Sequence, residues 1–338
     1  MTLAEVKRII KTECDKIRGQ THVKAAIYNC IVAAFMAGGF HEPILLVAPP
    51  GVGKSRILEL WNALFRACLG RRVLKFSRGE ETGTKNSFIE DVLVPHFHDK
   101  PAVLSIDEAH EMNAKNKAII RSLLEPRADR RPNTVRFHSD YECTFDPNKQ
   151  TIILATNQID KLDDALISRC RRIDLSLYSD EEMMGILTDG LTAQAGMPNI
   201  TFADNTLKTI AACNRGTARD LIHWINAIRN RCTLTGKNSI NKADAKLIIE
   251  SRECYPLGVT ANELKTLLYL ESKGELQLKE LAALNIINVK EQNANEKYLL
   301  QRRLIGIDSK RRLTTEGREY LADLRKHKYS IDGLIAKK

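Results

Sequence analysis

Short apolar runs alternate with longer amphipathic segments through the first half of the chain. The runs PILLVA (43–48), AVLSID (102–107) and TIILATN (151–157) are typical of strands buried in a parallel sheet. Helical spacing of apolar positions, three to four residues apart, is found in residues 3–40, 53–70, 86–98 and 113–125. Strands that alternate with helices predict an α/β domain.

The strand pattern stops after residue 178. Amphipathic helices continue to residue 252, which predicts a small helical lid domain, and the proline and glycine of YPLGV (255–259) predict a linker. The remaining pattern gives helices at 261–272, 277–284 and 290–302, a hairpin that turns at DSKR (308–311), and a last helix. Three helices and a hairpin predict a winged helix-turn-helix. The expected domains are therefore residues 1–178, 179–254 and 255–338.

Composition narrows the classes of protein that this chain can belong to. With 338 residues, 43% hydrophobic and 28% charged, it has ordinary globular composition, which excludes a membrane protein or a wholly disordered one. A net charge of +10 is compatible with a polyanionic partner. Eight scattered cysteines, no metal-ligand spacing and no apolar leader at the start predict a cytoplasmic protein with reduced thiols and no metal other than Mg²⁺.

The segment APPGVGKS (48–55) lies between an apolar strand and a helix, as a phosphate-binding loop does. Backbone N–H groups at such a glycine-rich turn point at phosphates, Lys54 reaches the β and γ oxygens, and Ser55 offers its hydroxyl to Mg²⁺. The first glycine of the usual motif is Ala48 here. ATP and Mg²⁺ are the expected cofactors, with the nucleotide held by Pro50, Gly51, Val52, Gly53, Lys54, Ser55 and Arg56.

Two adjacent acids end the second apolar strand, and an amide follows the third. We expect Asp107 to hold Mg²⁺, and Glu108 to orient or deprotonate the attacking water. Asn157 would lie between the γ-phosphate and that water, although an asparagine at the end of a strand is also typical of a turn. His110 is predicted to be a helix-start residue rather than a catalyst.

With these motifs, the chain resembles the AAA+ ATPases and, more narrowly, the RuvB family of bacterial motors that drive Holliday-junction branch migration. IRGQTHVKAAI (17–27) is similar to the family's Gly-Gln box around the adenine, and LSLYSDEEM (175–183) would place Tyr178 near the base. NRGTARDL (214–221) resembles the segment that supplies the sensor 2 arginine, here Arg219, from the lid domain. The family has proline where this chain has Ala218, and usually threonine at the position of Asn157.

The segment LISRCRRIDL (166–175) sets three arginines in an apolar run. The AAA+ resemblance implies that Arg169 meets the γ-phosphate bound by an adjacent subunit, and therefore that the chain forms a ring, expected to be a hexamer. Arg171 would be a second interface contact and Arg172 a structural ion-pair residue. The SRC tripeptide itself resembles clamp loaders more than RuvB.

Two further segments bear on partners. The stretch 296–317 resembles the family's winged helix with a basic wing, so we expect sequence-independent contact with DNA phosphates by Arg302, Arg303, Lys310, Arg311 and Arg312. NTVRFHSDYECTF (133–145) alternates like a β-hairpin turning at HSD, with Val135, Phe137, Tyr141 and Phe145 on its apolar face. In the family a hairpin at this point docks the partner that grips the junction; an edge hairpin of the core is the alternative.

The sequence therefore favours an ATP-hydrolysing, ring-forming DNA motor of recombination, repair or replication. An ATP-switched loader or matchmaker, similar to clamp loaders or initiators, is the second hypothesis, which Asn157 and the SRC tripeptide favour. A DNA-binding regulator with a degenerate ATP site is the third, and the intact Lys54 and Glu108 argue against it.

Overall fold

The computed structural model describes residues 1–39, 41–126, 131–138, 141–192, 199–203, 205–331 and 333–335. The chain folds into two compact units. The first comprises residues 1–182 together with 217–219, and the second comprises residues 183–216 and 220–338. The three domains expected from the sequence, with boundaries after residues 178 and 254, stay a prediction.

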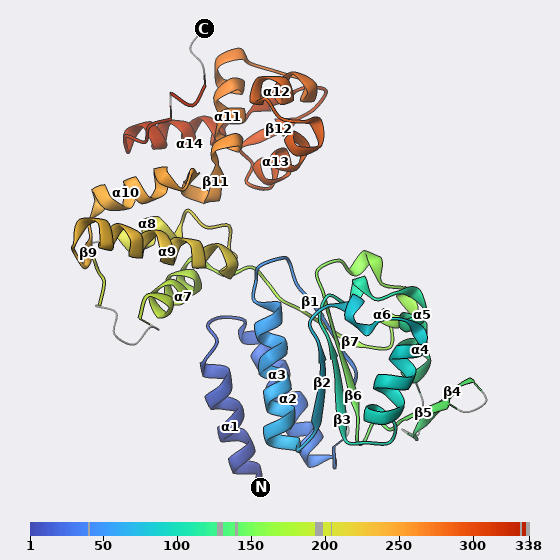
Figure 1. The fold of residues 1–338 in the computed structure, drawn as a ribbon. Coiled ribbons are helices and arrows are strands. Elements are labelled where there is room, and N and C mark those ends of the chain that lie inside the picture. The colour runs from blue at the N-terminus through green and yellow to red at the C-terminus, as the bar shows by residue number, and fades with distance from the viewer. Residues whose placement is uncertain are drawn as a thin grey trace. The chain divides into compact units, whose positions relative to one another are not determined.

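The first unit is built on a five-stranded parallel sheet in the order β2-β3-β6-β1-β7 (Figure 1). The three inner strands, β3 (Ala102–Ile106), β6 (Thr151–Thr156) and β1 (Ile44–Val47), are the three apolar runs, and nearly all of their residues are buried. The edge strands β2 (Arg72–Phe76) and β7 (Arg171–Asp174) carry exposed charged side chains and were not predicted. The α/β fold expected from the alternating pattern is confirmed.

Helices cover both faces of this sheet, with α2 and α3 on one side and α4 to α6 on the other (Figure 1). The predicted segment 3–40 is two helices, α1 (Leu3–Asp15) and α2 (Thr21–Met36), because Gln20 before α2 has a left-handed backbone with φ 53°. The remaining elements are α3 (Lys54–Leu69), η1 (Gly79–Thr82), α4 (Lys85–Ser87), the π-helix η2 (Phe88–Phe97), η3 (Ala109–Glu111), α5 (Ala114–Leu123), η4 (Ile159–Lys161) and α6 (Asp164–Ile167).

The predicted hairpin forms from β4 (Asn133–His138) and β5 (Tyr141–Phe145), while turn residues 139 and 140 lie outside the described residues. Its apolar side packs onto the core of its own unit: Cys143 and Phe145 are buried there, and Val135 and Phe137 lie against the same cluster. Tyr141 follows the same alternation as Cys143 and Phe145 but is exposed, so it does not pack on this core. The alternative of a hairpin at the edge of the core describes the structure better than an apolar face free for a partner.

The second unit begins with a helical part that contains α8 (Thr206–Ala211), α9 (Ala218–Thr235), α10 (Lys242–Ser251) and most of α7 (Asp180–Thr192). Two short strands, β8 (Thr201–Phe202) and β9 (Ser239–Ile240), pair in parallel. Trp224 of α9 and Leu187 of α7 are fully buried, as the amphipathic pattern of these helices requires.

The winged helix-turn-helix is present as predicted. It comprises α11 (Ala261–Lys273), α12 (Leu278–Asn285), α13 (Val289–Gln301), the wing strands β12 (Ile305–Ile307) and β13 (Arg311–Leu313), and α14 (Thr315–Lys326). The segment predicted to be a linker is instead hydrogen-bonded structure, because β10 (Cys254–Tyr255) pairs with β11 (Val259–Thr260) around η5 (Pro256–Gly258). Within the described ranges, every helix is too short or too polar to cross a membrane.

Candidate active site

The phosphate-binding loop owes its shape to two glycines. Gly51 and Gly53 have φ values of 83° and 89°, a region that residues with a Cβ rarely adopt, and α3 begins directly afterwards at Lys54. The turn therefore presents backbone N–H groups at a helix N-terminus, where an anion is favoured. A Cβ on Gly51 would lie 3.2 Å from the Cβ atoms of Thr217 and Arg219, so this stretch rests directly against the loop.

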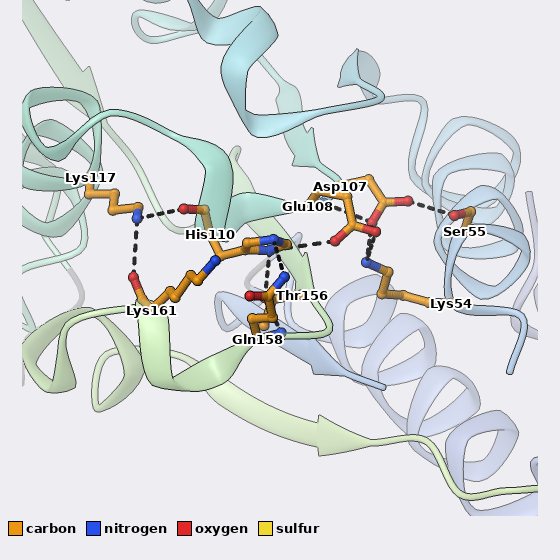
Figure 2. Close-up of polar contacts among 9 residues, drawn as sticks. All are labelled: Lys54, Ser55, Asp107, Glu108, His110, Lys117, Thr156, Gln158 and Lys161. Atoms are coloured by element: carbon orange, nitrogen blue, oxygen red, sulfur yellow. Dashed lines mark hydrogen bonds and ion pairs between the residues drawn. The ribbon is translucent and has the colours of Figure 1, made fainter. Parts of the chain in front are cut away.

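A cation and a hydroxyl meet two carboxylates beside this loop (Figure 2). Lys54 Nζ lies 2.9 Å from Asp107 Oδ1 and 2.7 Å from Glu108 Oε1. Ser55 Oγ donates to Asp107 Oδ2 at 2.6 Å. Lys54 and Asp107 are both buried, so their charges interact in a low dielectric, where an unmatched charge is costly. The Ser55 and Asp107 oxygens are the hard ligands that Mg²⁺ prefers, and the cluster fits Mg·ATP.

Glu108 has a strained backbone at the carboxyl end of β3, with φ 46° and ψ 47°. Its N–H donates to Asp107 Oδ1 at 2.8 Å, which keeps the two carboxylates on one tight turn. A Cβ on Gly79 would lie 2.6 Å from the Glu108 carbonyl oxygen, so η1 packs directly against that turn. Such conformations cost about 1–3 kcal/mol each and gather at functional sites, which supports a catalytic role for this residue.

His110 contacts the second oxygen of Glu108, a contact that sequence reasoning missed. Its Nδ1 lies 3.4 Å from Glu108 Oε2 and 3.1 Å from Thr156 Oγ1, and its Nε2 lies 3.0 Å from the side-chain nitrogen of Gln158 (Figure 2). Since the Gln158 amide donates, Nε2 accepts and Nδ1 carries the proton toward Glu108 and Thr156. His110 is the second residue of η3, close to the helix start that was expected, and its buried ring also contacts Glu108. Its position two residues after Glu108 was the available signal.

The turn that carries His110 is fixed by a cation from α5. Lys117 Nζ donates to the His110 carbonyl oxygen at 2.8 Å and to the Lys161 carbonyl oxygen at 3.1 Å (Figure 2). The turns after β3 and β6 are therefore connected through one side chain.

Asn157 directly follows β6, the neighbour of β3 in the sheet, and its buried Oδ1 accepts no hydrogen bond from the described residues. A buried amide oxygen without a donor there fits a catalytic water.

The residues expected around the base and at sensor 2 also lie at the loop. Tyr178 is buried and its hydroxyl donates to the Val52 carbonyl oxygen at 3.0 Å, while burial raises the pKa of this phenol. Gln20 Nε2 donates to the Ser176 carbonyl oxygen at 2.6 Å, so the Gly-Gln box lies beside the tyrosine segment. The Arg219 N–H donates to the Gly51 carbonyl oxygen at 3.1 Å.

Arg56 and the three arginines of residues 166–175 lie outside the Lys54 cluster. Arg56 is exposed, with Glu59 at 3.7 Å. The Arg169 guanidinium lies 2.5 Å from Glu125 of its own chain. Arg171 Nη1 donates to Cys30 Sγ at 3.3 Å. Arg172 makes a two-pronged pair with Asp174, with Nε 2.9 Å from each carboxylate oxygen, in agreement with its predicted ion-pair role.

In the basic wing, one arginine forms an ion pair with a buried carboxylate and the other cations are exposed. Arg311 Nε lies 2.9 Å from Glu296 Oε2, and the carboxyl side chain of Glu296 is only 1% exposed. This pairing contradicts the expectation that Arg311 is available to DNA. Arg312 is exposed, with exposed Asp308 at 3.1 Å, and Arg302, Arg303 and Lys310 are exposed as well.

Candidate metal ligands in the described part of the chain include its histidine, cysteine and acidic side chains. Among the described residues, three or more histidine, cysteine or acidic side chains never gather as a metal site would require. All eight cysteines are free thiols. Burial raises the pKa of Cys143 and of Cys170 to about 12, so both stay protonated and unreactive at neutral pH.

Comparisons with known proteins agree with this site. The sequence model of the ATPase family associated with various cellular activities (AAA) matches residues 44–180. The Holliday junction branch migration complex subunit RuvB of Fervidobacterium nodosum is 25% identical over 316 residues, which are 88% of this chain and 84% of that protein. The Thermotoga maritima protein of the same name is 24% identical, over 89% of this chain and 88% of its own length.

A solved structure extends the likeness to the fold. The Thermotoga maritima RuvB Holliday junction branch migration motor has a TM-score of 0.66 to this chain at 23% identity, covering 91% of this chain and 96% of that one. A more distant relative, the Lon protease of Syntrophomonas wolfei, is 27% identical but shares only 55% of this chain and 25% of its own length. Together with the geometry around Lys54 and Glu108, these findings show that residues 44–180 form an AAA ATPase domain and that the chain resembles RuvB over most of its length.

Proposed function

We propose that this protein is an ATP-driven, ring-forming motor that moves branched DNA in recombination or repair, of the kind that drives Holliday-junction branch migration. The observation that supports this most is the cluster of Lys54, Ser55, Asp107 and Glu108, which brings together the cation, the hydroxyl and the two carboxylates that a phosphate-loop ATPase uses. The relatives that match over most of the chain carry the name of a branch migration subunit. The exposed basic wing supplies a surface for DNA phosphates.

Hydrolysis follows from how the cluster rearranges around ATP. Lys54 would exchange its carboxylate partners for the β and γ oxygens, which frees Glu108 to take a proton from the attacking water. Mg²⁺, held by Ser55 and Asp107, would neutralise charge on the phosphates. His110 Nδ1, 3.4 Å from Oε2 of Glu108, would limit the movement of that carboxylate while Oε1 changes partner, and Asn157 would position the water.

We further propose that Arg169 acts on the nucleotide of an adjacent copy of the chain. In a single chain its guanidinium pairs with Glu125 and also donates to the Ala165 carbonyl oxygen. The Arg169 side chain is 17% exposed and that of Glu125 is 57% exposed, so solvent reaches the pair from the carboxylate side and the arginine can exchange partners. An arginine placed beside the γ-phosphate of a neighbour stabilises the charge of the transition state. Turnover would then require assembly into a ring, which we propose to be a hexamer.

DNA contact is assigned to Arg302, Arg303, Lys310 and Arg312, and Arg311 is removed from that set. Phosphate contacts of this kind carry no sequence information, and each makes binding more sensitive to salt. A partner protein that grips the junction is no longer assigned to the apolar face of residues 133–145, since that face packs on its own core.

The test is branch migration of a labelled four-way DNA junction by the purified protein with ATP. We expect ATP-dependent conversion of the junction into two duplexes, and none with Glu108→Gln, which should bind ATP without hydrolysing it. DNA-stimulated ATP turnover without strand movement would instead support the loader, which Asn157 and the SRC tripeptide favour. Turnover that no DNA stimulates would contradict both.

A further inference from the structure

Arg215 lies four residues before Arg219 in the NRGTARDL segment, and its side chain fixes the segment that leads into the winged helix. Its guanidinium pairs with the carboxylate of Glu263, which is 1% exposed. Its Nε donates to the Gly258 carbonyl oxygen at 2.8 Å. The guanidinium carbon also lies 4.0 Å from the centre of the Tyr298 ring, at the distance of a strong cation–π contact.

The segment between the lid helices and the winged helix is held from both sides by these groups. Tyr298 Oη donates to the Leu257 carbonyl oxygen at 2.5 Å, and Tyr320 Oη donates to that of Pro256 at 2.8 Å. A Cβ on Gly258 would lie 2.7 Å from Arg215 Cγ, so the backbone approaches the arginine as closely as a glycine permits. Because these contacts hold the segment from both sides, a displacement of Arg215 would act on the segment and on Tyr298 together.

The Tyr298 ring also contacts the guanidinium of Arg302, one of the residues assigned to DNA contact. The guanidinium carbon of Arg302 lies 5.4 Å from the ring centre, and its Nε donates to Tyr298 Oη at 3.1 Å. Arg302 is exposed at the C-terminal end of α13. The position of its charge is therefore set by a ring that Arg215 also holds.

The other end of the same segment touches the nucleotide site. Thr217 and Arg219 lie against Gly51 of the phosphate-binding loop, and only Gly216, with φ 81°, separates Thr217 from Arg215. A nucleotide that displaced residues 217–219 would act on Arg215 through this single residue, at the boundary between the two compact units.

We propose that Arg215 and Tyr298 are positioning residues that couple the nucleotide at the phosphate-binding loop to the DNA-contacting Arg302. This inference rests on the proposed function, because it requires both an ATP site and a DNA surface. Neither residue touches ATP, and neither is needed for hydrolysis itself. Their role is to make the affinity for DNA depend on which nucleotide is bound.

The test measures the Kd of the full-length protein for a fluorescent duplex in the presence of a non-hydrolysable ATP analogue and, separately, of ADP. For the wild type we expect the two values to differ by about 5- to 150-fold, the usual range of allosteric coupling. Tyr298→Leu should bring their ratio close to one while ATP binding is unchanged. Tyr298→Phe keeps the ring between the two guanidinium groups but loses the hydroxyl bonds with Leu257 and Arg302, so its ratio should lie between those of the wild type and Tyr298→Leu.

A control variant separates coupling from general damage to the domain. Arg325→Met removes an ion pair with Glu271 at 2.7 Å in the same winged helix and should leave the ratio unchanged. If Tyr298→Leu does not fold, Arg215→Lys takes its place: it keeps a charge beside Glu263 but loses the donor to Gly258, and the ratio should again fall.

Three results would overturn the proposal. In the first, the ratio of the two Kd values in Tyr298→Leu, or in Arg215→Lys if that variant is used, equals the wild-type ratio. In the second, the Arg325→Met control loses as much of the ratio as the test variant. The third is a wild type that binds DNA equally with both nucleotides, which refutes the coupling but leaves the proposed function standing. If the wild type binds no DNA with either nucleotide, the proposed function fails too.

Discussion

Replacing Arg311 by methionine should destabilise the winged helix instead of weakening its hold on DNA. Arg311 Nε lies 2.9 Å from Glu296 Oε2, and Glu296 is 1% exposed while the arginine side chain is 16% exposed. Glu296 in turn accepts from Gln292 Nε2 at 3.2 Å, in a buried network that also includes Asn285 and Thr266. Arg311→Met would leave this carboxylate buried without its cation.

The magnitude follows from this geometry. Breaking a buried ion pair by removal of one partner costs about 3–5 kcal/mol. Because Gln292 still donates to Glu296, we expect the low end, about 3 kcal/mol of unfolding free energy. At a urea m-value of about 2 kcal/mol/M, the midpoint for this region would fall by roughly 1.5 M.

Urea unfolding followed by circular dichroism measures this shift, and duplex binding is measured on the same samples in dilute urea-free buffer. The matched control is Arg312→Met, because Arg312 and Asp308 are both exposed: its stability should change by less than about 0.5 kcal/mol, whereas its DNA affinity should fall. The double variant Glu296→Met with Arg311→Met removes both charges and should recover most of the loss. An Arg311→Met protein with wild-type stability and weakened DNA binding would refute this reasoning.

Three other predictions concern the ATP site and the core. Equilibrium binding and phosphate release should show no ATP bound by Lys54→Ala, but ATP bound without turnover by Glu108→Gln; equal binding by the two variants would contradict their roles. His110→Ala should bind ATP normally and turn it over about tenfold more slowly or worse, since Glu108 loses a fixed orientation; unchanged turnover would make His110 purely structural. Burial lowers the pKa of His41 to about 4, so the ring is neutral in the folded protein. The free energy of unfolding should therefore be highest above about pH 6.5, the ordinary pKa of histidine, and should decrease by about 3 kcal/mol as the pH falls to 4. His41→Phe should remove that part of the pH dependence in unfolding experiments, and an unchanged slope would count against it.

The central strands could be predicted because helices cover both of their faces, which makes β1, β3 and β6 continuous apolar runs. The edge strands could not, since Lys75 of β2 and Arg171 of β7 are tolerated where one side of the strand is open. The break between α1 and α2 includes Gly19 and Gln20, which both have a left-handed backbone. Gly19 was the available signal, whereas glutamine has no preference for that conformation.

The chemistry of the site could be predicted as far as local motifs reach. Lys54 and Glu108 follow from spacing after a strand, but the contact of His110 with Thr156 joins residues 46 positions apart. On the wing, the sequence does not distinguish Arg311 from Arg312. Consecutive residues of a strand point to opposite faces, and so Arg311 pairs with buried Glu296 while Arg312 is exposed. Only the fold decides which of them is available to DNA.

The central claim is that one ATP site needs two copies of the chain, one with Glu108 and the other with Arg169. The most direct test mixes Glu108→Gln, which keeps its arginine, with Arg169→Ala, which keeps its acid, and measures ATP turnover. Each variant alone should be slower than wild type by about 10³-fold or more. In a head-to-tail ring assembled at random from equal amounts, the mixture should regain about a quarter of wild-type turnover. A mixture no more active than its components, or an Arg169→Ala protein as active as wild type, would contradict the claim.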